Sequence, residues 1–331
     1  MNERRPLDRR PVFVTGGSGF IGQHVLEALR ERGISARALA RSDAAADAVS
    51  HVGADVVRGD LANLTSLTAG MRGCQAVLHL AALVRDDGSR EDFQRDVIDG
   101  TSNVLTAAQT AGVGRFVHMS TEAVLAAGKA LDTDEREPYP RHTVGLYSWS
   151  KQEAEKRVLA AASGDFHTVA VRPTFVWGRG DTVLLPQITA AVTGNRFAWV
   201  GGGRARKSTS HVRNVVEGTL RALEFGASGE AYFINDAEVR VLRDFLTELL
   251  ATQGIDIHAG DIPLPLAYGA AKATEAAWRL TGRHGTPALS VAALNLVFMD
   301  WVFSCEKAQR ELGYAPVVSL ADGMAELRGA S

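Results

Sequence analysis

Short apolar runs recur through the first half of the chain, and helix-length segments rich in Ala, Leu, Glu and Arg separate them. A run that is apolar at nearly every position is typical of a strand buried on both faces of a sheet. The alternation of such strands with helices predicts βαβ units, whose right-handed crossovers give a parallel doubly wound sheet. We predict strands over residues 12–15, 35–40, 55–57, 76–80, 115–119 and 168–171, and helices over 20–32, 64–71, 90–111 and 146–161.

This alternation is lost beyond about Pro173, where frequent glycines and prolines indicate irregular structure. We therefore predict an α/β fold in which a Rossmann-type doubly wound sheet carries a smaller C-terminal α/β substrate lobe. The expected units are a flexible tail over 1–10, a dinucleotide-binding domain over 11–175 with a returning segment near 207–225, and the lobe over 176–206 and 226–331. Residues 131–143, with two prolines among charges, are expected to form an exposed connection.

Composition limits the classes of function. The chain has 331 residues, of which 46% are hydrophobic, and can bury a sizeable core. Its 36 basic and 38 acidic side chains give a formal net charge of −2, so no nucleic acid partner is expected. Cys74 and Cys305 lie far apart and form neither a disulfide framework nor a metal-site pattern. We therefore expect a protein of the reducing cytoplasm.

No uncharged apolar segment reaches the roughly 18 residues of a membrane-spanning helix, so no membrane span is expected. The nearest approach is the segment 262–280, which carries Lys272, Glu275 and Arg279 at helical spacing. This pattern predicts an amphipathic helix that packs against the second lobe. A substrate lid and a weak peripheral membrane contact are the alternatives.

The sequence VFVTGGSGFIG near the N-terminus is the most informative motif, because an apolar run meets a glycine-rich turn there and a helix then begins. Gly16 permits a tight turn, Gly19 lets the backbone approach a pyrophosphate, and Gly22 lets the helix pack closely on the strand. The helix N-terminus at Phe20 and Ile21 offers N–H groups to the anion. The motif predicts a dinucleotide site, although such turns also join strand to helix without a ligand.

Tyr147 and Lys151 are four residues apart in a predicted helix, so they lie on one face, one turn apart. A tyrosine with its usual pKa of about 10 is a poor proton carrier at neutral pH, but an adjacent ammonium group lowers that pKa. The lysine would also reach a ribose hydroxyl. Because this spacing is common on surface helices, a catalytic role depends on the neighbouring motifs.

Two hydroxyl residues, Ser120 and Thr121, follow the predicted strand 115–119. Ligands collect at the carboxyl edge of a parallel sheet. A hydroxyl there can hydrogen-bond a substrate oxygen and share its proton path with the phenol of Tyr147. The alternative is an ordinary helix or turn cap.

Together these motifs resemble the extended short-chain dehydrogenase/reductases, of the NAD(P)-dependent epimerase/dehydratase superfamily. The resemblance covers most of the chain and also rests on RGDLAN, HLAA, DGTSNVLTAA, FVHMST, VRPTFVWG and FSCEKAQRELGYAP, in the family's usual order. The late part of the chain is most similar to the branch of 3β-hydroxysteroid dehydrogenase-like, sterol decarboxylase and dihydroflavonol reductase-like enzymes.

The resemblance implies a site. Thr121, Tyr147 and Lys151 would be catalytic, with Ser120 as the substitute for Thr121. The further cofactor residues that it implies are Asp60 and Leu61 beside the adenine, Ala81 and Ala82 in the nucleotide groove, and Pro173 and Val176 near the nicotinamide ring. Members of the family commonly pair through two long helices per subunit, so residues 90–111 and 146–161 would form a homodimer contact.

The form of the cofactor is predicted from the tip of the second strand, where Arg41 stands and no acid occurs before Asp43. A carboxylate there suits the ribose diol of NAD(H), whereas arginine suits the 2′-phosphate of NADP(H). With Arg37 on the same strand, the sequence favours NADP(H), and NAD(H) is the alternative. In that case Arg41 stacks on the adenine or faces solvent.

The substrate is predicted from side chains that are mostly apolar or aromatic, with Val84, Leu184 and Trp199 as candidates. They favour a bulky hydrophobic small molecule, sterol-like or polycyclic. We interpret the chain as an oxidoreductase that transfers hydride between a nicotinamide and a secondary alcohol or ketone. A nucleotide-sugar epimerase or dehydratase is one alternative, because the basic residues of the segment 204–207 suit a second diphosphate. A non-catalytic NADP(H)-sensing protein is another.

His79 and His118 lie inside predicted strands, so we expect them to be structural. Asn214 stands where the family commonly has an aspartate, a departure that affects a cofactor-side contact and not the chemistry. No cluster of His, Cys, Asp and Glu has metal-ligand spacing. No metal is expected, and the resemblance implies that the nicotinamide carries the hydride.

Overall fold

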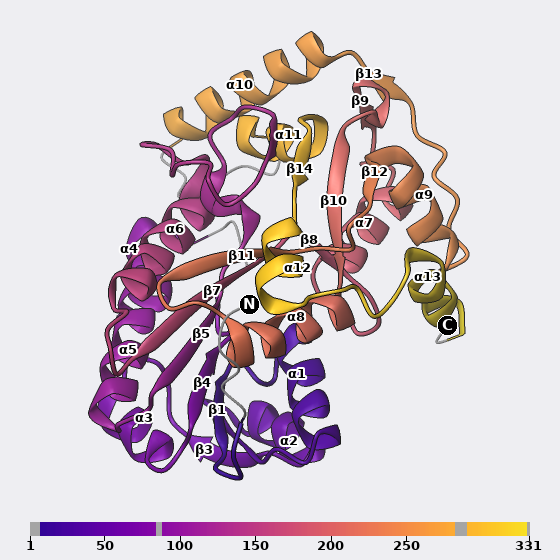
Figure 1. The fold of residues 1–331 in the computed structure, drawn as a ribbon. Helices are drawn as coiled ribbons and strands as arrows, with labels where there is room; N and C mark the ends of the chain where they lie inside the picture. Colours follow the sequence, from indigo (N-terminus) through magenta and orange to yellow (C-terminus); the bar gives the residue numbers. More distant parts are fainter. Residues whose placement is uncertain (1–6, 84–87, 282–289, 330–331) are drawn as a thin grey trace.

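The central feature of the protein is a seven-stranded parallel sheet that carries helices on both faces (Figure 1). The computed structural model describes residues 7–83, 88–281 and 290–329. The strands are β1 (Val12–Thr15), β2 (Ala36–Ala40), β3 (Asp55–Arg58), β4 (Ala76–His79), β5 (Arg115–Met119), β7 (His167–Pro173) and β11 (Glu230–Ile234). Their order, β11-β7-β5-β4-β1-β2-β3, reverses its direction of winding between β1 and β4. The predicted Rossmann-type doubly wound fold is confirmed.

Helices cover both faces of this sheet. They are α1 (Phe20–Glu31), α2 (Asp43–His51), α3 (Leu64–Met71), α4 (Arg90–Phe93), η1 (Gln94–Asp99), α5 (Gly100–Thr110), α6 (Gly145–Ala160) and α8 (Val212–Phe225). On β1, Val14 belongs to a core cluster shared with α1 and α8, whereas Phe13 belongs to one shared with α3 and α5. Successive residues of a strand point to opposite faces of the sheet, and helices cover both faces here, so both side chains are fully buried. The predicted helix 90–111 is α4, the π-helical η1 and α5 in succession.

A second lobe stands beyond the carboxyl edge of this sheet (Figure 1). Its sheet has the order β12-β10-β14-β6, with β8 also paired to β10, and a two-stranded sheet joins β13 to β9. The strands are β6 (Leu131–Thr133), β8 (Phe175–Trp177), β9 (Trp199–Val200), β10 (Arg206–His211), β12 (Val239–Val241), β13 (Asp261–Ile262) and β14 (Trp301–Phe303). The helices are η2 (Glu122–Leu125), α7 (Leu184–Thr193), η3 (Gly201–Gly203), α9 (Leu242–Ala251), α10 (Leu264–Leu280), α11 (Val291–Phe298), α12 (Glu306–Leu312) and α13 (Leu320–Gly329).

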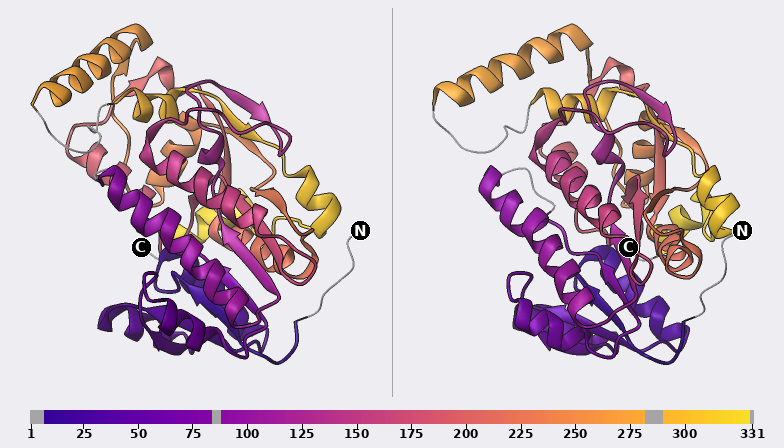
Figure 2. Two further views of the ribbon diagram at one scale, coloured as in Figure 1. Left: turned by 90° about the vertical axis from the view of Figure 1, so that its left-hand side faces the viewer. Right: turned by 60° about the vertical axis from the view of Figure 1, so that its left-hand side comes forward.

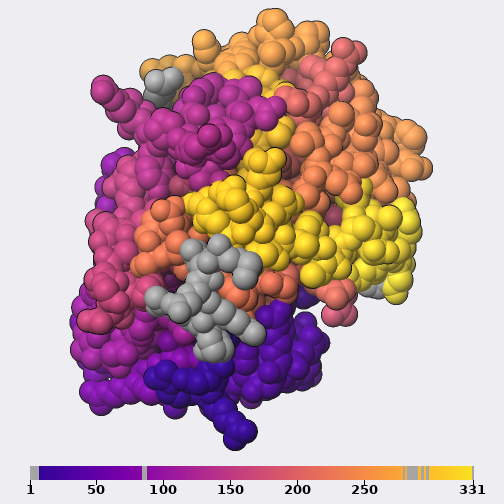
Figure 3. Space-filling model, viewed as in Figure 1, coloured from indigo at the N-terminus to yellow at the C-terminus, as the bar shows by residue number. Residues whose placement is uncertain are grey.

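Three strands lie in a different unit from the one that the predicted boundaries give. β10 falls in the predicted returning segment near 207–225, yet it pairs with β12 and β14 in the second lobe. β11 follows the predicted returning segment, yet it completes the large sheet beside β7. β6 lies inside the predicted dinucleotide domain, yet it pairs with β14 in the second lobe. In Figure 3 the yellow C-terminal part of the chain lies across the face of the molecule, where α12 packs on α8 and β11. Several separate parts of the chain therefore build each unit, with α12 included in the core of the large sheet, and a linear division cannot describe them.

The exposed connection predicted at residues 131–143 is wrong in two respects. Its first residues form β6, which pairs with β14. Later in the segment, the Tyr139 hydroxyl donates a 2.5 Å hydrogen bond to Glu155 of α6, and Glu155 pairs with Arg172 of β7 at 2.6 Å. The Glu155 and Arg172 side chains are 0% and 4% exposed. The segment is thus fastened to a buried ion pair of the dinucleotide domain.

The predicted tail is described only from Leu7 onward, and residues 1–6 lie outside the described part. Leu7 packs against the core of the large sheet. The Asp8 amide donates to Gln75 Oε1 at 2.8 Å, and the Gln75 amide donates to the Asp8 and Arg10 carbonyls. The prediction of a flexible segment is therefore wrong for residues 7–10.

The amphipathic helix predicted at 262–280 is α10, which extends along the edge of the second lobe next to α11 (Figure 2). Ala267 and Ala271 are buried on the side that packs toward α11. Leu266 and Leu280 are 66% and 87% exposed. None of the described helices is both long and apolar enough to cross a membrane.

Candidate active site

The turn between β1 and α1 has a backbone that leaves no room for a side chain at two of its glycines. A Cβ at Gly22 would lie 2.1 Å from the Gly16 carbonyl oxygen. A Cβ at Gly16, whose φ is +72°, would lie 2.6 Å from the Ala81 nitrogen. Gly19 caps α1 without a side chain, so the first N–H groups of the helix have no capping group. This cradle fits the diphosphate of a dinucleotide.

The other residues predicted beside the dinucleotide surround this cradle. Phe20 and Ile21 form the first turn of α1. Ala81 and Ala82 follow β4, and the Ala81 amide donates to the hydroxyl of Thr15, the last residue of β1, at 3.3 Å. The structure therefore brings the glycine loop and the end of β4 together at one edge of the sheet.

Asp60 and Leu61 lie directly after β3. The Asp60 carboxylate accepts hydrogen bonds from the Ala62 and Asn63 amides at 2.8 and 3.0 Å, so it shapes its own turn. The Leu61 carbonyl accepts a 2.9 Å bond from Asn103 of α5. The turn is thus anchored to a helix of the domain, and its predicted place beside the adenine stays a prediction.

Thr121 lies at the carboxyl end of β5 and caps η2. Its Oγ1 accepts a hydrogen bond from the Ala123 amide at 3.2 Å and donates one to the Glu122 carboxylate at 2.9 Å. The cap interpretation therefore describes the hydroxyl in this structure, at the edge where ligands collect. The neighbouring Ser120 hydroxyl is buried and has no hydrogen-bond partner among the described residues.

Tyr147 and Lys151 lie on α6, one turn apart. Tyr147 is half-buried and packs against Phe93 and Val97. Lys151 is 1% exposed, and its ammonium group donates a 2.6 Å hydrogen bond to the carbonyl of Met119, the last residue of β5. Burial lowers the pKa of Lys151 to about 8, against the opposing effect of a nearby carboxylate. The lysine is thereby fixed at the end of the strand that leads to Thr121.

Of the two strand histidines, His79 is structural as predicted. Its ring nitrogens bond the hydroxyls of Thr15 at 2.7 Å and Thr101 at 3.0 Å. His118 stacks on His79 and places Nε2 at 3.4 Å from the Lys151 ammonium group, whereas its Nδ1 has no partner among the described residues. Burial lowers the pKa of both rings, so two neutral imidazoles lie beneath Lys151. The sequence prediction missed this contact, which follows from the position of His118 one residue before Met119.

The tip of β2 holds Arg41 as predicted, and its side chain is exposed. Arg37 does not join it, because its guanidinium donates to the Gly70 and Arg72 carbonyls at the end of α3. The second arginine of this edge is Arg58, the last residue of β3, which pairs with Asp43 at 2.8 Å. The sequence prediction missed Arg58, although its place at a strand end marks it.

Comparison with known proteins agrees with this geometry. Residues 12–234 match the NAD dependent epimerase/dehydratase family, a range that holds the glycine loop, Thr121, Tyr147 and Lys151. The chain belongs to this family. The identification confirms the resemblance and the prediction of a nicotinamide-dependent oxidoreductase.

Individual relatives within the family are similar over nearly their whole length. The "4-hydroxy-2-methyl-3-oxo-4-farnesyl-3,4-dihydroquinoline-1-oxide ketoreductase" of Stigmatella aurantiaca is 46% identical over 321 residues, which cover 96% of each chain. A "3 beta-hydroxysteroid dehydrogenase/Delta 5→4-isomerase" of Mycobacterium tuberculosis is 33% identical over 334 residues, 95% of this chain and 88% of the relative. The dTDP-glucose 4,6-dehydratase DesIV of Streptomyces venezuelae, solved with NAD and DAU bound, has a TM-score of 0.75 at 23% identity and shares the fold, over 96% of this chain and 95% of its own.

Asn214, the departure from the epimerase/dehydratase pattern, has a structural reason. It is fully buried, and its side-chain amide donates 2.7 Å and 2.9 Å hydrogen bonds to Asp236 and the Val318 carbonyl. Its oxygen accepts the Val317 and Val318 amides. Asp236 also accepts bonds from the side chains of Trp177 and Thr209 and from the His211 amide. An aspartate at 214 would set two carboxylates against each other here.

The predicted nicotinamide and substrate residues fall into different environments. Pro173 ends β7 and is buried, and Val176 of β8 and Leu184 of α7 are half-buried. Trp199 is 2% exposed and packs in the core of the second lobe with Trp177 and Phe245, so it does not line an open surface. Val84 lies outside the described residues.

The basic segment 204–207, which favours a nucleotide-sugar enzyme of this family, is largely committed within the lobe. Arg206 pairs with Asp300 at 2.8 Å and Asp132 at 3.1 Å. The Lys207 ammonium group donates to the Met299 carbonyl at 2.6 Å. Arg204 is exposed and forms no hydrogen bond or ion pair with the described part of the chain. Within the described residues, no group of three or more His, Cys, Asp and Glu side chains could hold a metal ion.

Proposed function

We propose that the protein is an NADP(H)-dependent ketoreductase that interconverts a ketone and a secondary alcohol in a bulky hydrophobic molecule. The observation that carries the proposal is the anchoring of Lys151 to the Met119 carbonyl. This bond fixes the Tyr147–Lys151 helix against the strand that ends at Thr121, on the same sheet edge as the glycine cradle. A proton carrier, a hydroxyl and a dinucleotide site then share one place.

In the proposed mechanism the glycine loop would hold the dinucleotide diphosphate, and the bound nicotinamide would supply the hydride. The carbonyl carbon gains that hydride, and the oxygen takes the phenolic proton of Tyr147, which gives the secondary alcohol. Lys151 lowers the pKa of the phenol, so that Tyr147 gives up its proton near neutral pH. Thr121 orients the substrate oxygen with a hydrogen bond.

The relatives support a hydrophobic substrate, since one is named for a farnesylated dihydroquinoline oxide and another for a hydroxysteroid. A polycyclic or prenylated ketone is therefore the proposed class. The nucleotide-sugar alternative has less support, because Arg206 and Lys207 are held by partners within the lobe. The sensor alternative has less support because Tyr147 and Lys151 are both present.

The test is a substrate panel with purified protein. Prenylated quinolone-type ketones and steroid ketones are incubated with NADPH or NADH, and nucleotide sugars with NADP⁺ or NAD⁺. Both the nicotinamide redox state and the product are followed. We expect a hydrophobic ketone to consume NADPH in a one-to-one ratio with alcohol formed. Conversion of a nucleotide sugar without net nicotinamide consumption would identify an epimerase or dehydratase instead. Cofactor binding without turnover of any class would identify a sensor.

The preference for NADP(H) is a separate prediction. Arg41 and Arg58 bring two guanidinium groups to the adjoining ends of β2 and β3, which suits a 2′-phosphate. Replacing Arg41 by Ala should raise KM for NADPH by roughly 10–100-fold, as expected for a lost hydrogen bond to a charged group. KM for NADH, measured on the same variant, is the control and should stay near its wild-type value. Equal losses with both cofactors would contradict the 2′-phosphate contact.

We also propose a homodimer built on α5 and α6. The two helices lie side by side, and Arg157 of α6 donates a 2.7 Å hydrogen bond to Ser102 of α5, so they present one continuous surface. The expected mass in solution at micromolar concentration is that of two chains, measured by light scattering during gel filtration. A monomeric mass would contradict the dimer.

The cytoplasmic location stays a proposal and rests on two cysteines that form no disulfide, Cys74 and Cys305.

A further inference from the structure

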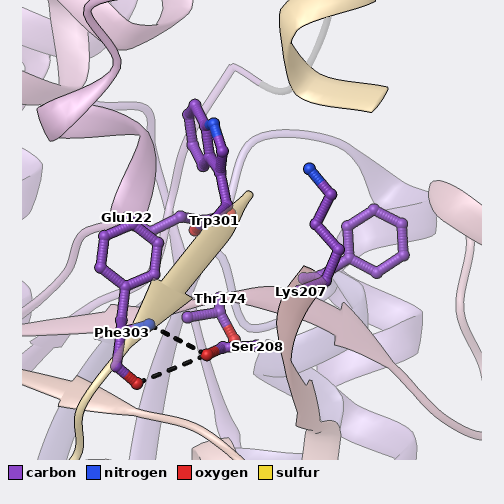
Figure 4. A pocket seen from close by; sticks show the side chains of 7 residues that line it. Glu122, Thr174, Lys207, Ser208, Trp301 and Phe303 are labelled. Carbon is purple, nitrogen blue, oxygen red and sulfur yellow. Dashed lines mark hydrogen bonds between the residues drawn. The ribbon is translucent and has the colours of Figure 1, made fainter. Parts of the chain in front are cut away.

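Glu122 is an acidic residue that the predicted catalytic set does not use. It follows Thr121 directly, opens η2, and lines a cavity of about 10 Å³, near the lower limit for one water molecule. Figure 4 shows Glu122 beside Phe303 and Trp301, with Lys207 across the cavity. The cavity lies against Thr174 and Phe175, in the segment predicted to approach the nicotinamide.

The hydrogen bonds of Thr121 show why this carboxyl matters. A hydroxyl group has a single hydrogen to donate and two lone pairs that accept. In the structure Thr121 donates its hydrogen to Glu122 at 2.9 Å, and one lone pair accepts from the Ala123 amide at 3.2 Å. With this arrangement Thr121 has no hydrogen left for a ketone oxygen. The hydroxyl can serve a ketone only if the bond to Glu122 reverses its direction.

We propose that Glu122 is a positioning residue that acts through Thr121. When its carboxyl holds a proton, Glu122 donates to Thr121 Oγ1, and the Thr121 hydrogen turns toward the substrate oxygen. When the carboxyl is ionised, it withdraws that hydrogen. The inference rests on the proposed ketoreductase function and deepens it, because it assigns the state in which the site can bind a ketone.

The surroundings of Glu122 bring the pKa of its carboxyl close to neutral pH. Burial raises the pKa of Glu122 to about 7, although the hydrogen bond from Thr121 and the charge of Lys207 act in the opposite direction. β8 and β14 present uncharged side chains to the cavity. α6 packs against η2 and carries the titratable residues Tyr147 and Lys151. Burial lowers the pKa of Lys151 to about 8. The pKa of Lys207 on β10 is likewise lowered by burial to about 8. Glu122 therefore loses its proton before either lysine as the pH rises.

The first experiment is the pH profile of kcat/KM for ketone reduction. In the wild type we expect a fall that begins near pH 7, where Glu122 ionises, and that approaches tenfold per pH unit. Glu122→Gln introduces an amide whose N–H can donate to Thr121 at every pH. The fall near pH 7 should therefore disappear, and only a fall at higher pH, from ionisation of the Tyr147 phenol, should remain. Glu153→Gln, on the exposed surface of α6, is the matched control and should keep the wild-type profile. A Glu122→Gln variant with an unchanged fall near pH 7 would overturn the proposal.

The second experiment needs no turnover and so separates this inference from the proposed function. The carboxyl of Glu122 is titrated by NMR of isotope-labelled glutamate, with Glu122→Gln to assign the signal. Thr121→Val removes the donor that stabilises the carboxylate, so the pKa of Glu122 should rise. If the pKa does not change in that variant, Glu122 is not coupled to Thr121 and the proposal fails. If the coupling is present but no ketone of the panel is reduced, the proposed function fails instead.

Discussion

Replacing Tyr147 by Phe should lower kcat for ketone reduction by about 10²–10⁴-fold, the usual contribution of a positioned acid or base. Phenylalanine retains the ring that packs against Phe93 and Val97, so the fold and the cofactor site should persist. Only the hydroxyl that passes the proton is lost. The measurement is steady-state reduction of the best ketone of the panel, with the Kd for NADPH determined on the same variant by fluorescence.

Tyr268→Phe is the matched control for this substitution. Tyr268 lies on α10 in the second lobe and bonds Asn295, so removal of its hydroxyl should leave kcat near the wild-type value. Turnover of the Tyr147 variant at the wild-type rate would show that another group carries the proton. A large loss of NADPH affinity in that variant would show that Tyr147 acts mainly in binding.

The second large effect is expected in stability. Glu155→Gln removes the charge that balances Arg172, and Arg172 is 4% exposed with its Nη1 already unpartnered among the described residues. Breaking a buried ion pair by removing one partner costs about 3–5 kcal/mol, because the remaining charge is left without compensation. This loss is a large share of the roughly 5–15 kcal/mol that stabilises a typical native protein. Urea-induced unfolding of the wild type and of Glu155→Gln gives the difference in their free energies of unfolding.

Glu153→Gln on the same helix shows what an exposed pair contributes. Glu153 pairs with Lys156 at 2.9 Å, but the two side chains are 38% and 40% exposed. Such pairs contribute roughly 0–1 kcal/mol, so this variant should unfold close to the wild type. A Glu155 variant as stable as the Glu153 variant would mean that the buried pair contributes little.

Six of the seven strands of the large sheet could be predicted from the sequence, because most of them are largely buried and read as mainly apolar runs. On β1, Phe13 and Val14 face opposite core clusters, so residues 12–14 are apolar on both faces of the strand. The glycine loop could be predicted for an equally local reason. Its backbone excludes a Cβ at Gly16 and Gly22, so the structural requirement is written directly in the residue type.

The second lobe could not be predicted in detail, because its strands are short and pair across the chain. β6 has three residues and finds its partner β14 only through a contact between residues 131–133 and 301–303. No local pattern reveals such a pairing. For the same reason the sequence placed Tyr139 in an exposed connection, while the structure bonds it to Glu155.

In the candidate site, the residues that repeat a family motif could be named from the sequence and stay predictions, whereas the residues that contact them could not be named. Thr121, Tyr147 and Lys151 stand in recognisable motifs, but the contacts of Glu122 and His118 depend on which way neighbouring side chains turn. For Arg37 the sequence predicted a contact with the cofactor that the side-chain direction does not support. Arg37 lies on the expected strand, yet it faces the carbonyl groups at the end of α3.

The bond between Asn214 and Asp236 also limits how this protein can change over generations. A single exchange of Asn214 for Asp would place like charges in a buried contact and remove the side-chain N–H groups that donate to Asp236 and to the Val318 carbonyl. Restoring a carboxylate at position 214 thus requires position 236 to change first or together with it. We therefore expect homologues that carry Asp at position 214 to carry a different residue at position 236.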